Sequence, residues 1–302
     1  MRRSVQSVLG QSFTDLELIV VDDASTDHTQ QVLREFSDSR LKVIRREENC
    51  SAAVARNTGI DEARGEFVAF NDDDDFWFCH KLERQVAVLR SCPDAVWCLA
   101  GFLLLAPSGA RYVGGPKYRA QIDYSEGVSR GHVDGRNDWS MVATPGWVVR
   151  REALSSVGGF DPHIRSFDDW ELGLRLSQLA PPVFVDEPLF VQDLVAGGGV
   201  RRQELARAFD IRVIMRKHAE IWANRPEVLS HHWYLIGRFL SVHEPPPAGR
   251  EELRKALSIR PLYWRYWLAL ALTYVGADLN RRWMKKLRQL KHRSGPASVR
   301  SS

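Results

Sequence analysis

Three groups of aspartates in this sequence could bind a cation or move a proton. Four consecutive carboxylates, Asp72–Asp75, follow the apolar run FVAF, and Asp22 and Asp23 follow the apolar run LIVV. A third pair, Asp168 and Asp169, opens an amphipathic segment. Like charges at contact distance repel one another, so four adjacent carboxylates cost stability unless a cation or strong hydrogen-bond donors neutralise them. The sequence therefore predicts a positive partner at Asp72–Asp75.

The segments around these acids predict alternating strands and helices. Residues 16–23 and 41–47 have the pattern of strands, residues 25–36 and 51–63 have helical spacing, and residues 65–75 form a third strand that ends on acids. Apolar strands that alternate with helices favour an α/β fold with a mostly parallel sheet and helices on both faces. Ligands bind beyond the carboxyl ends of such strands, so the first two acidic clusters are expected to converge on one edge.

The rest of the chain is predicted to complete this domain and to add a helical region. Residues 101–138 are rich in Gly and Arg and are expected to form loops and edge strands, and residues 181–194 are expected to form the last core strand. The run Gly197–Gly199 is the predicted boundary between a catalytic domain, residues 1–199, and a helical C-terminal region, residues 200–302.

Composition limits the class of protein. The chain has 302 residues with a formal charge of +4, but residues 250–302 alone carry about +10 and the remainder about −6. The four cysteines have neither CxxC nor His/Cys ligand spacing, which favours reduced thiols in the cytosol over a metal site. The longest apolar stretch, Leu262–Gly276, is too short to span a bilayer and contains Arg265.

The basic tail has three interpretations. It can be a solvated helical face, a surface that lies on anionic lipid, or a nucleic-acid contact, and the last is disfavoured because no reader motif accompanies the charge. The lipid interpretation uses six aromatic and basic residues, Trp264, Trp267, Trp283, Lys285, Lys286 and Arg288. His231 and His232 lack an acidic partner at metal-ligand spacing and are predicted to lie on a polar helix surface.

Several motifs together resemble one known family. The segments are SVQSVLGQSF, ELIVVDDASTDHT, NCSAAVARNTGIDEARGEFVAFNDDDDFW, VVRREALSSVGGFDP and FDDWELGLRL. In this order and spacing, over about residues 4–190, the chain resembles the family 2 glycosyltransferases of the GT-A fold. The resemblance implies a Rossmann-like mixed sheet and transfer of a sugar from a nucleotide donor.

The resemblance also implies roles for the first two acidic clusters. Asp23, with Asp22 beside it, would accept a hydrogen bond from the nucleotide base, and the outer acids of a DxD pattern would hold Mg²⁺ or Mn²⁺ against the diphosphate. Alternate residues of extended backbone point to the same side, so Asp72 and Asp74 could share one ion. A register slipped by one residue would instead choose Asp73 and Asp75, and both registers stay open.

Five further residues receive roles by the same resemblance. Asp169 would be the general base that deprotonates the acceptor hydroxyl, so that the sugar carbon is attacked with inversion. Arg56 would contact the donor, Asp72 would lie on the donor side as well as on the metal, and Gly159, Phe160 and Asp168 would lie on the acceptor side. Taken alone, the Asp72–Asp75 run would fit a solvated acidic loop, and the Asp168 pair would fit helix-capping acids.

The sequence departs from the family pattern in two places. Relatives begin with a strand of the VSVIIPTYN kind, whereas this chain begins with MRRSVQSVLGQSF, which corresponds to the following helix. We expect either that the natural reading frame begins upstream or that the chain is a truncated, impaired copy. Relatives also carry an Arg and a His after the last core strand, where this chain has Phe190–Leu194, so that histidine contact cannot be carried over.

The expected function is that of an inverting, metal-dependent glycosyltransferase. The donor would be a nucleotide-diphosphate sugar, most simply UDP-linked, and the acceptor a saccharide or lipid-linked hydroxyl in cell-surface polysaccharide synthesis. The chain would lie in the cytoplasm, in peripheral contact with the inner face of the plasma membrane through its basic tail. The alternatives are a sugar nucleotidyltransferase and a catalytically impaired nucleotide-binding or scaffold protein.

Overall fold

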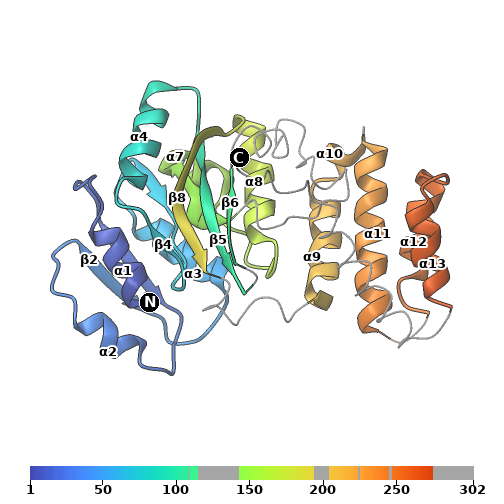
Figure 1. Cartoon of the computed structure of the whole chain (residues 1–302), viewed down its shortest axis with the longest axis horizontal. Helices are drawn as coiled ribbons and strands as arrows, with labels where there is room; N and C mark the ends of the chain where they lie inside the picture. Colours follow the sequence, from blue (N-terminus) through green and yellow to red (C-terminus); the bar gives the residue numbers. More distant parts are fainter. Residues whose placement is uncertain (108, 115–142, 194–203, 224, 245–246, 275–302) are drawn as a thin grey trace, which may run out of the picture. The chain divides into compact units, whose positions relative to one another are not determined.

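The computed structural model divides the chain into two compact units, Met1–Arg202 and Gln203–Ser302, which we call the N-terminal and C-terminal units. The predicted boundary at Gly197–Gly199 lies outside the described residues, and the assignment of catalysis to the first part stays a prediction. The structure (Figure 1) describes residues 1–107, 109–114, 143–193, 204–223, 225–244 and 247–274.

The N-terminal unit alternates strands and helices as predicted. Its described elements are α1 (Arg2–Leu9), β1 (Leu18–Asp22), α2 (Thr29–Arg34), β2 (Leu41–Arg45), α3 (Ala52–Glu62), β3 (Phe67–Ala69), β4 (Phe76–Trp77), α4 (Lys81–Ser91), β5 (Trp97–Ala106), β6 (Gly109–Val113), the 3₁₀ turn η3 (Thr144–Gly146), β7 (Trp147–Arg150), α7 (Arg151–Val157), α8 (Asp168–Leu179) and β8 (Val183–Asp193).

The strands of this unit form a mixed arrangement in two pieces. Strands β1 and β2 pair in parallel as a separate two-stranded sheet, and the other strands follow the order β3-β7-β5-β8-β4, with β6 on β5. The predicted predominance of parallel pairs is wrong for the described strands, because only β1–β2 and β5–β8 are parallel and the other pairs are antiparallel. A continuous apolar run reports burial on both faces and does not by itself fix strand direction.

The core of the N-terminal unit is built around β5. This strand pairs with β6, β7 and β8, and most of its side chains are buried. The rings of Trp97, the first residue of β5, and Trp147, the first residue of β7, are both buried and meet edge to face at 5.1 Å. The prediction of loops and edge strands from residue 101 onward is therefore wrong up to Ala106, because Gly101 interrupts an otherwise apolar run without ending the strand. Residues 115–142 lie outside the described part of the chain.

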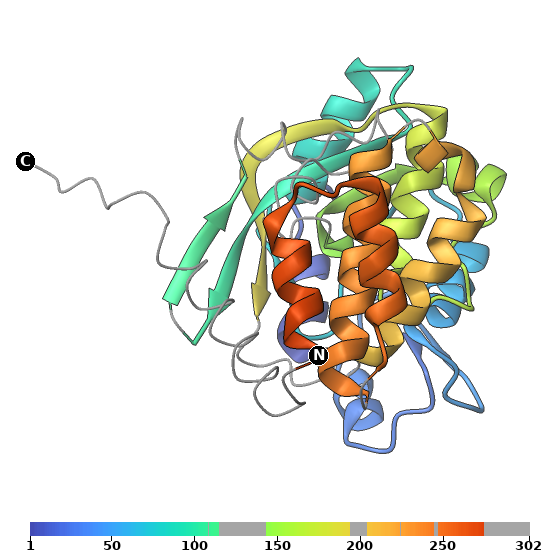
Figure 2. The ribbon, with the colours of Figure 1, turned by 90° about the vertical axis from the view of Figure 1, so that its right-hand side faces the viewer.

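The C-terminal unit is helical, as predicted. Its described elements are α9 (Glu204–Lys217), α10 (Ala219–Ala223), α11 (Pro226–His243), α12 (Arg250–Ile259) and α13 (Trp264–Leu272). Helix α11 packs against both α9 and α12, and α13 packs on α12 (Figure 2). None of the described helices has both the length and the apolar character needed to cross a membrane.

The two histidines of α11 are buried, so the prediction of a polar helix surface is wrong. His231 and His232 lie in the interior of the unit, and the His232 ring meets Trp222 edge to face at 5.1 Å. Because α11 is covered by neighbours on two sides, more of its circumference is buried than a surface helix would show. The adjacent polar residues His231 and His232 therefore did not indicate which face of α11 is exposed.

Candidate active site

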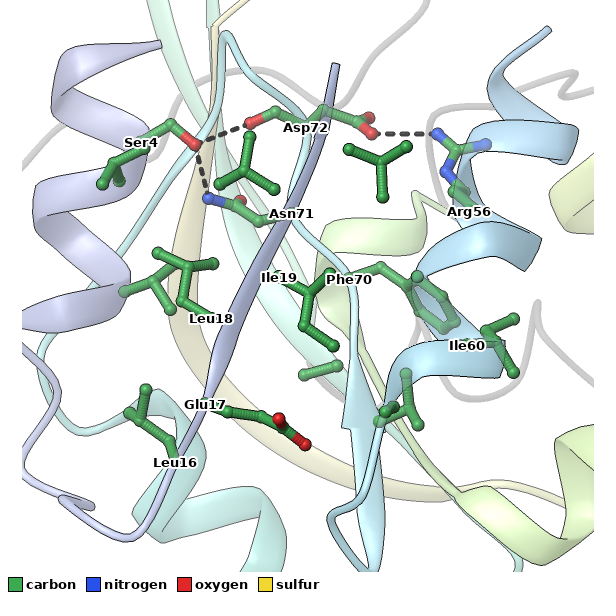
Figure 3. Close-up of a pocket in the computed structure, with 18 of the residues that line it drawn as sticks. Ser4, Leu16, Glu17, Leu18, Ile19, Arg56, Ile60, Phe70, Asn71 and Asp72 are labelled. Carbon is green, nitrogen blue, oxygen red and sulfur yellow. Dashed lines mark hydrogen bonds and ion pairs between the residues drawn. The ribbon is translucent and has the colours of Figure 1, made fainter. Parts of the chain in front are cut away.

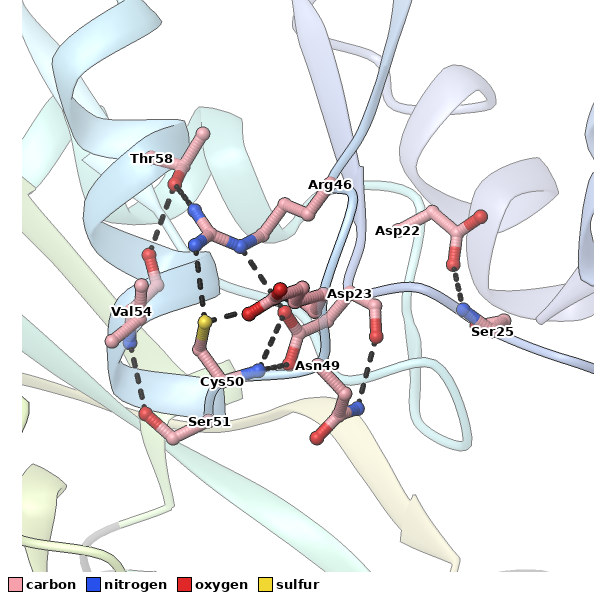
Figure 4. Close-up of polar contacts among 10 residues, drawn as sticks. Asp22, Asp23, Ser25, Arg46, Asn49, Cys50, Ser51, Val54 and Thr58 are labelled. Atoms are coloured by element: carbon pink, nitrogen blue, oxygen red, sulfur yellow. Dashed lines mark hydrogen bonds and ion pairs between the residues drawn. The ribbon is translucent and has the colours of Figure 1, made fainter.

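The first acid of the β1 end is held inside the protein. The Asp22 carboxylate is buried, accepts a hydrogen bond from the Ser25 amide at 2.9 Å and from the Gln30 side chain, and lies 3.3 Å from Arg45 (Figure 4). Burial raises the pKa of Asp22, but these hydrogen bonds and Arg45 more than offset it and hold the pKa below its ordinary value. The Asp22 carboxylate therefore stabilises the turn that follows β1.

The second acid, Asp23, ties two loops together. Its carboxylate accepts from the Cys50 amide at 3.1 Å and lies 3.2 Å from Arg46, while Asn49 donates to the Asp23 carbonyl at 2.9 Å. The next residue, Ala24, has φ 59°, a left-handed conformation that a residue with a Cβ adopts at a cost. The chain thus holds a strained turn at the end of β1, beside the loop that leads into α3.

The four-acid run forms a turn and not an extended strand. Strand β3 ends at Ala69, and the Asp75 amide donates to the Asp72 carbonyl at 3.3 Å across a β-turn. The prediction that alternate acids share a side because the backbone is extended is therefore wrong. Asp74 is partly buried, and burial together with the neighbouring Asp72 and Asp73 raises its pKa. These carboxylates are crowded, as the sequence predicted.

The last acid of the run is turned inward. Asp75 is buried and accepts a hydrogen bond at 3.0 Å from the amide of Asp193, at the end of β8. Burial, chiefly, and the charge of Asp72 raise the pKa of Asp75 to about 8. Arg3 in turn donates to the Asp193 carboxylate at 2.9 Å. This arrangement supports the Asp72 and Asp74 register over the register of Asp73 and Asp75.

Arg56 joins the second and third acidic clusters. Its guanidinium donates to Asp72 at 2.9 Å and to Asp168 at 2.7 Å, and it lies 5.4 Å from the centre of the Phe160 ring. Burial lowers the pKa of Arg56, but the charges of Asp72 and Asp168 outweigh burial and raise it. Arg56 is the positive partner that the sequence predicted, and it comes from α3, the helix packed on β1.

The third cluster stands at the start of α8. Asp168 is the first residue of the helix, Asp169 the second, and Phe167 at the N-cap makes no capping side-chain bond. Asp169 accepts a hydrogen bond from the Trp170 amide at 2.7 Å. Burial, followed by the charge of Asp168, raises the pKa of Asp169 to about 7. A carboxylate with this pKa can take up a proton near neutral pH.

Sequence reasoning missed Asn57, which fixes the predicted acceptor side. Its side-chain amide donates to the Phe160 carbonyl at 2.8 Å, and its side-chain oxygen accepts from the Phe160 amide at 2.8 Å. The Phe160 ring meets Phe70 edge to face at 5.3 Å. The only sequence signal for Asn57 was its position next to Arg56 in the helical segment. The residue type alone does not indicate what an asparagine on a helix contacts.

Ser4 is a second residue that the sequence prediction missed. Its hydroxyl donates to the Asp72 carbonyl at 3.0 Å and accepts from the Asn71 side chain at 2.9 Å. Through Ser4, helix α1 holds the backbone on which the Asp72 carboxylate is mounted.

Replacing Gly159 with alanine is expected to destabilise this region. Gly159 has φ +67°, and a Cβ there would lie 2.5 Å from the Asn57 oxygen that holds Phe160. We expect a loss of about 2–4 kcal/mol in the free energy of unfolding from left-handed strain and steric overlap. Urea unfolding of G159A measures it. The matched control is Gly158→Ala, with φ +80° and open space at the Cβ, which should lose about 1–2 kcal/mol. Equal losses in both variants would contradict the clash with Asn57.

A large cavity lies between β1 and β3. It has a volume of about 880 Å³, and residues of both strands line it, together with Met1 and Ser4 at the acid end (Figure 3). Its position matches the split between the two sheets.

The acids at the β3 end fit a divalent cation completed by other ligands. Among the residues that the structure describes, no three His, Cys, Asp or Glu side chains are grouped to hold a metal. The crowded Asp72 and Asp74 carboxylates would supply two hard oxygen ligands, a set that would suit Mg²⁺ or Mn²⁺ if phosphate and water filled the remaining positions. Burial and the charges of Asp72 and Asp73 raise the pKa of Asp74, and a nearby cation would favour its ionised form.

Strand-end acids, a mixed α/β sheet and an acidic helix start agree with the GT-A fold that the sequence predicted. Residues 1–103 match the family model of glycosyl transferase family 2, and the resemblance predicted from the sequence is confirmed.

Relatives and a solved structure agree with this assignment. The chain is 44% identical over 110 residues to the Bacillus subtilis protein TuaG, provisionally named a teichuronic acid biosynthesis glycosyltransferase, covering 35% of this chain and 42% of TuaG. It is 46% identical over 86 residues to the Escherichia coli protein WfgD, named a UDP-Glc:α-D-GlcNAc-diphosphoundecaprenol β-1,3-glucosyltransferase, covering 28% of this chain and 34% of WfgD. The chain thus matches less than half the length of either relative.

The solved structure is S. aureus TarS 1-349 in complex with UDP. It has a TM-score of 0.61 at 19% identity and covers 95% of this chain and 87% of that chain. At this identity the likeness concerns the fold, and the predicted GT-A fold class is confirmed.

Proposed function

We propose that this protein transfers a sugar from a UDP-linked donor to a hydroxyl acceptor with inversion at the sugar carbon. The observation that carries the proposal is Arg56, whose single guanidinium contacts Asp72 at 2.9 Å and Asp168 at 2.7 Å. It brings the acids proposed for the diphosphate end of the donor to the same place as the acids proposed for the acceptor end. The match of residues 1–103 to the family model supports the reaction class.

The donor would lie along the carboxyl ends of β1 and β3. Asp23, at the strained turn after β1, would accept a hydrogen bond from the base of the nucleotide, with Asp22 holding that turn. Asp72 and Asp74 would hold the divalent cation, and the cation would neutralise the diphosphate as it leaves. Two proteins support UDP as the nucleotide of the donor. WfgD, which is similar in sequence, has a UDP-linked donor in its name, and TarS, which is similar in fold, was solved in complex with UDP.

The chemical step requires one base. Asp169 would accept the proton of the acceptor hydroxyl while that oxygen forms a bond to the sugar carbon and the bond from this carbon to the diphosphate oxygen breaks. The bond electrons leave with the diphosphate, so no covalent intermediate with the protein forms. Phe160, held by Asn57, would form the wall against which the acceptor sugar is placed. Asp168 would position Arg56.

Titration calorimetry tests the donor site. UDP, GDP and their sugar conjugates are titrated with and without Mn²⁺ into the wild-type chain and the D72A/D74A double variant. We expect Mn²⁺-dependent binding of one nucleotide that weakens about 100-fold or more in the double variant, since both anionic ligands of the cation are lost. Asp94→Ala removes an exposed carboxylate elsewhere and should bind as wild type. Unchanged binding in the double variant would contradict the metal assignment.

The acceptor proposed is a lipid-linked saccharide, so the protein would work at an anionic membrane surface. WfgD carries a diphosphoundecaprenol-linked acceptor in its name. In the C-terminal unit, Leu262, Trp264 and Trp267 are 96%, 60% and 54% exposed; Arg260 precedes them and Arg265 follows Trp264. Exposed tryptophans beside arginines are typical of surfaces that lie on anionic lipid. The predicted lipid residues Trp283, Lys285, Lys286 and Arg288 lie outside the described part of the chain.

Vesicle sedimentation tests this surface. We expect binding to phosphatidylcholine vesicles that contain phosphatidylglycerol and about ten-fold weaker binding to phosphatidylcholine alone, because the arginines require anionic headgroups. The triple variant L262S/W264S/W267S should lose about ten-fold or more on the anionic vesicles. Phe209→Ser removes an equally exposed aromatic ring on α9 and serves as the control. Wild-type binding by the triple variant would assign the contact to another part of the chain.

The alternatives receive no support from a particular observation. A sugar nucleotidyltransferase would carry a glycine-rich loop with Lys or Arg for the phosphates, and the turn after β1 instead carries Asp22, Asp23 and Ala24. A binding or scaffold protein would bind the nucleotide in the calorimetric titration without turning over a donor.

A further inference from the structure

A second cavity lies within the C-terminal unit, in a part of the chain outside the match to the family model. Its volume is about 510 Å³, which falls within the range of about 300–1,000 Å³ that is typical of small-molecule sites. Residues of α9, α10, α11 and α12 line it, and these helices lie side by side (Figure 1). The whole lining therefore comes from one compact unit.

More than half of the lining is apolar. Met215 and Trp222 are its most deeply buried apolar members, at 6% and 2% exposed. Helix α10 contributes Ala219 and Ala223, about one turn apart and both exposed, and their short side chains leave the space beside this helix unfilled. The apolar residues of the lining are Met215, Ala219, Trp222, Ala223, Leu229 and Trp233.

Four charged residues of the lining form one balanced network. Arg212 of α9 donates to the Glu252 carboxylate of α12, and the Lys255 amine lies 2.6 Å from the Glu251 carboxylate. The hydrogen bond from Lys255, together with the charges of Lys255 and Arg212, lowers the pKa of Glu251. The Lys255 amine also lies 4.7 Å from the centre of the Trp233 ring. Two positive and two negative charges are thus neutralised within the lining.

Arg216 carries the positive charge that this network leaves over. It lies about one turn after Arg212 on α9, is exposed, and makes no ion pair with any residue in the described part of the chain. A guanidinium binds carboxylate and phosphate groups through two parallel hydrogen bonds. The cavity therefore combines an apolar wall with one surplus positive charge at its solvent-exposed rim.

We propose that this cavity binds an amphiphile that has an apolar chain and a single anionic head group. The chain would lie against Met215, Trp222 and Leu229, and the carboxylate or phosphate head group would bind Arg216. A cationic head group would be repelled by Arg216, and a head group with several negative charges would come close to the Glu251 carboxylate. The site goes beyond the proposed function, because it requires neither the donor site nor sugar transfer.

Titration calorimetry on the full chain tests the site with decanoate, decyl phosphate and decyltrimethylammonium, each below its micelle-forming concentration. These probes share a saturated chain of similar length and differ in their head groups. We expect the two anionic probes to bind at least about ten-fold more tightly than the cationic one, because only they can pair with Arg216. Inorganic phosphate should bind at least about ten-fold more weakly than decyl phosphate, because it lacks the apolar chain. The affinities of decanoate and decyl phosphate then assign the head group to a carboxylate or a phosphate ester.

Two exposed positions allow the cavity to be altered with little effect on folding. Arg216→Gln removes the surplus charge and should weaken decyl phosphate binding about ten-fold. Ala223→Phe should weaken it at least about ten-fold, because helical side chains lean toward the start of their helix and the ring would occupy the cavity beside Ala219. Arg254→Gln removes an exposed arginine of α12 outside the lining and should bind as wild type.

Four results would overturn the proposal. The first is that the folded chain binds neither anionic amphiphile, and the second is that it binds the cationic probe equally well. The third is wild-type affinity in both Arg216→Gln and Ala223→Phe. The fourth is loss of binding only in L262S/W264S/W267S, which would place the probe on the exposed surface of α13 and not in the cavity.

Discussion

Asp169→Asn is expected to lower kcat by about 10²–10⁴-fold while leaving the affinity for UDP within a few-fold of wild type. Asparagine retains an oxygen that can accept from the Trp170 amide, so the start of α8 should keep its conformation. It cannot take up the proton of the acceptor hydroxyl, and loss of a positioned base typically costs this factor. Single-turnover rates with a UDP-sugar donor, together with calorimetric UDP titration, measure the two quantities.

The pH dependence of the wild-type enzyme gives a second check of the same base. Burial, with the charge of Asp168 added to it, raises the pKa of Asp169 to about 7. A carboxylate acts as a base only when it is ionised. The rise of kcat/KM with pH should therefore have its midpoint near neutrality and not near pH 4. A cation bound at Asp72 would move the midpoint downward, because a nearby positive charge favours the ionised carboxylate.

Two outcomes would contradict the assignment of the base. If Asp169→Asn keeps its activity and Asp168→Asn loses it, the base is Asp168. If both variants keep it, neither acid is the base. The exposed Asp94→Asn is the matched control and should show the wild-type rate and pH profile.

The fold could be predicted wherever the chain repeats a local pattern. From Leu16 to Asp75, the strands and helices could be predicted because their signals are local. Apolar runs that end on acids indicate the strands, and helical spacing of apolar residues indicates the helices. Strand direction and partner could not be predicted, because pairing such as β5 with β7 joins residues about fifty positions apart. The β5 strand was missed beyond residue 100 because Gly101 sits inside a run that is buried on both faces.

The sequence predicted which residues lie in the candidate site but not how they are arranged. Each predicted acid lies at a strand or helix end, but the turn at Asp72–Asp75 differs from the extended backbone that the sequence suggested. The roles of Asp75 and Asn57 depend on partners at Asp193 and Phe160, more than one hundred residues away. No local pattern specifies such contacts, and only the folded chain shows them.

Arg56→Leu is expected to destabilise the N-terminal unit by about 3–5 kcal/mol. The guanidinium is partly buried and contacts Asp72 and Asp168, and Asp169 also lies within reach of its charge. Removing one partner leaves the other charges desolvated without compensation, which costs more than the pair contributes when it is intact. Leucine keeps the apolar stem but supplies no charge. Urea unfolding followed by tryptophan fluorescence measures the loss.

The pH dependence of the stability of the same variant separates charge from packing. If the loss comes from uncompensated carboxylates, lowering the pH toward 4 should narrow the difference between Arg56→Leu and wild type, because protonation removes the repulsion. Arg56→Lys keeps one charge but cannot bridge both acids, and should fall between the two. Arg34→Leu, an exposed arginine on α2, should change the free energy of unfolding by less than about 0.5 kcal/mol. A pH-independent loss in Arg56→Leu would mean that Arg56 acts through packing against Phe160, and the electrostatic link between the donor and acceptor acids would be wrong.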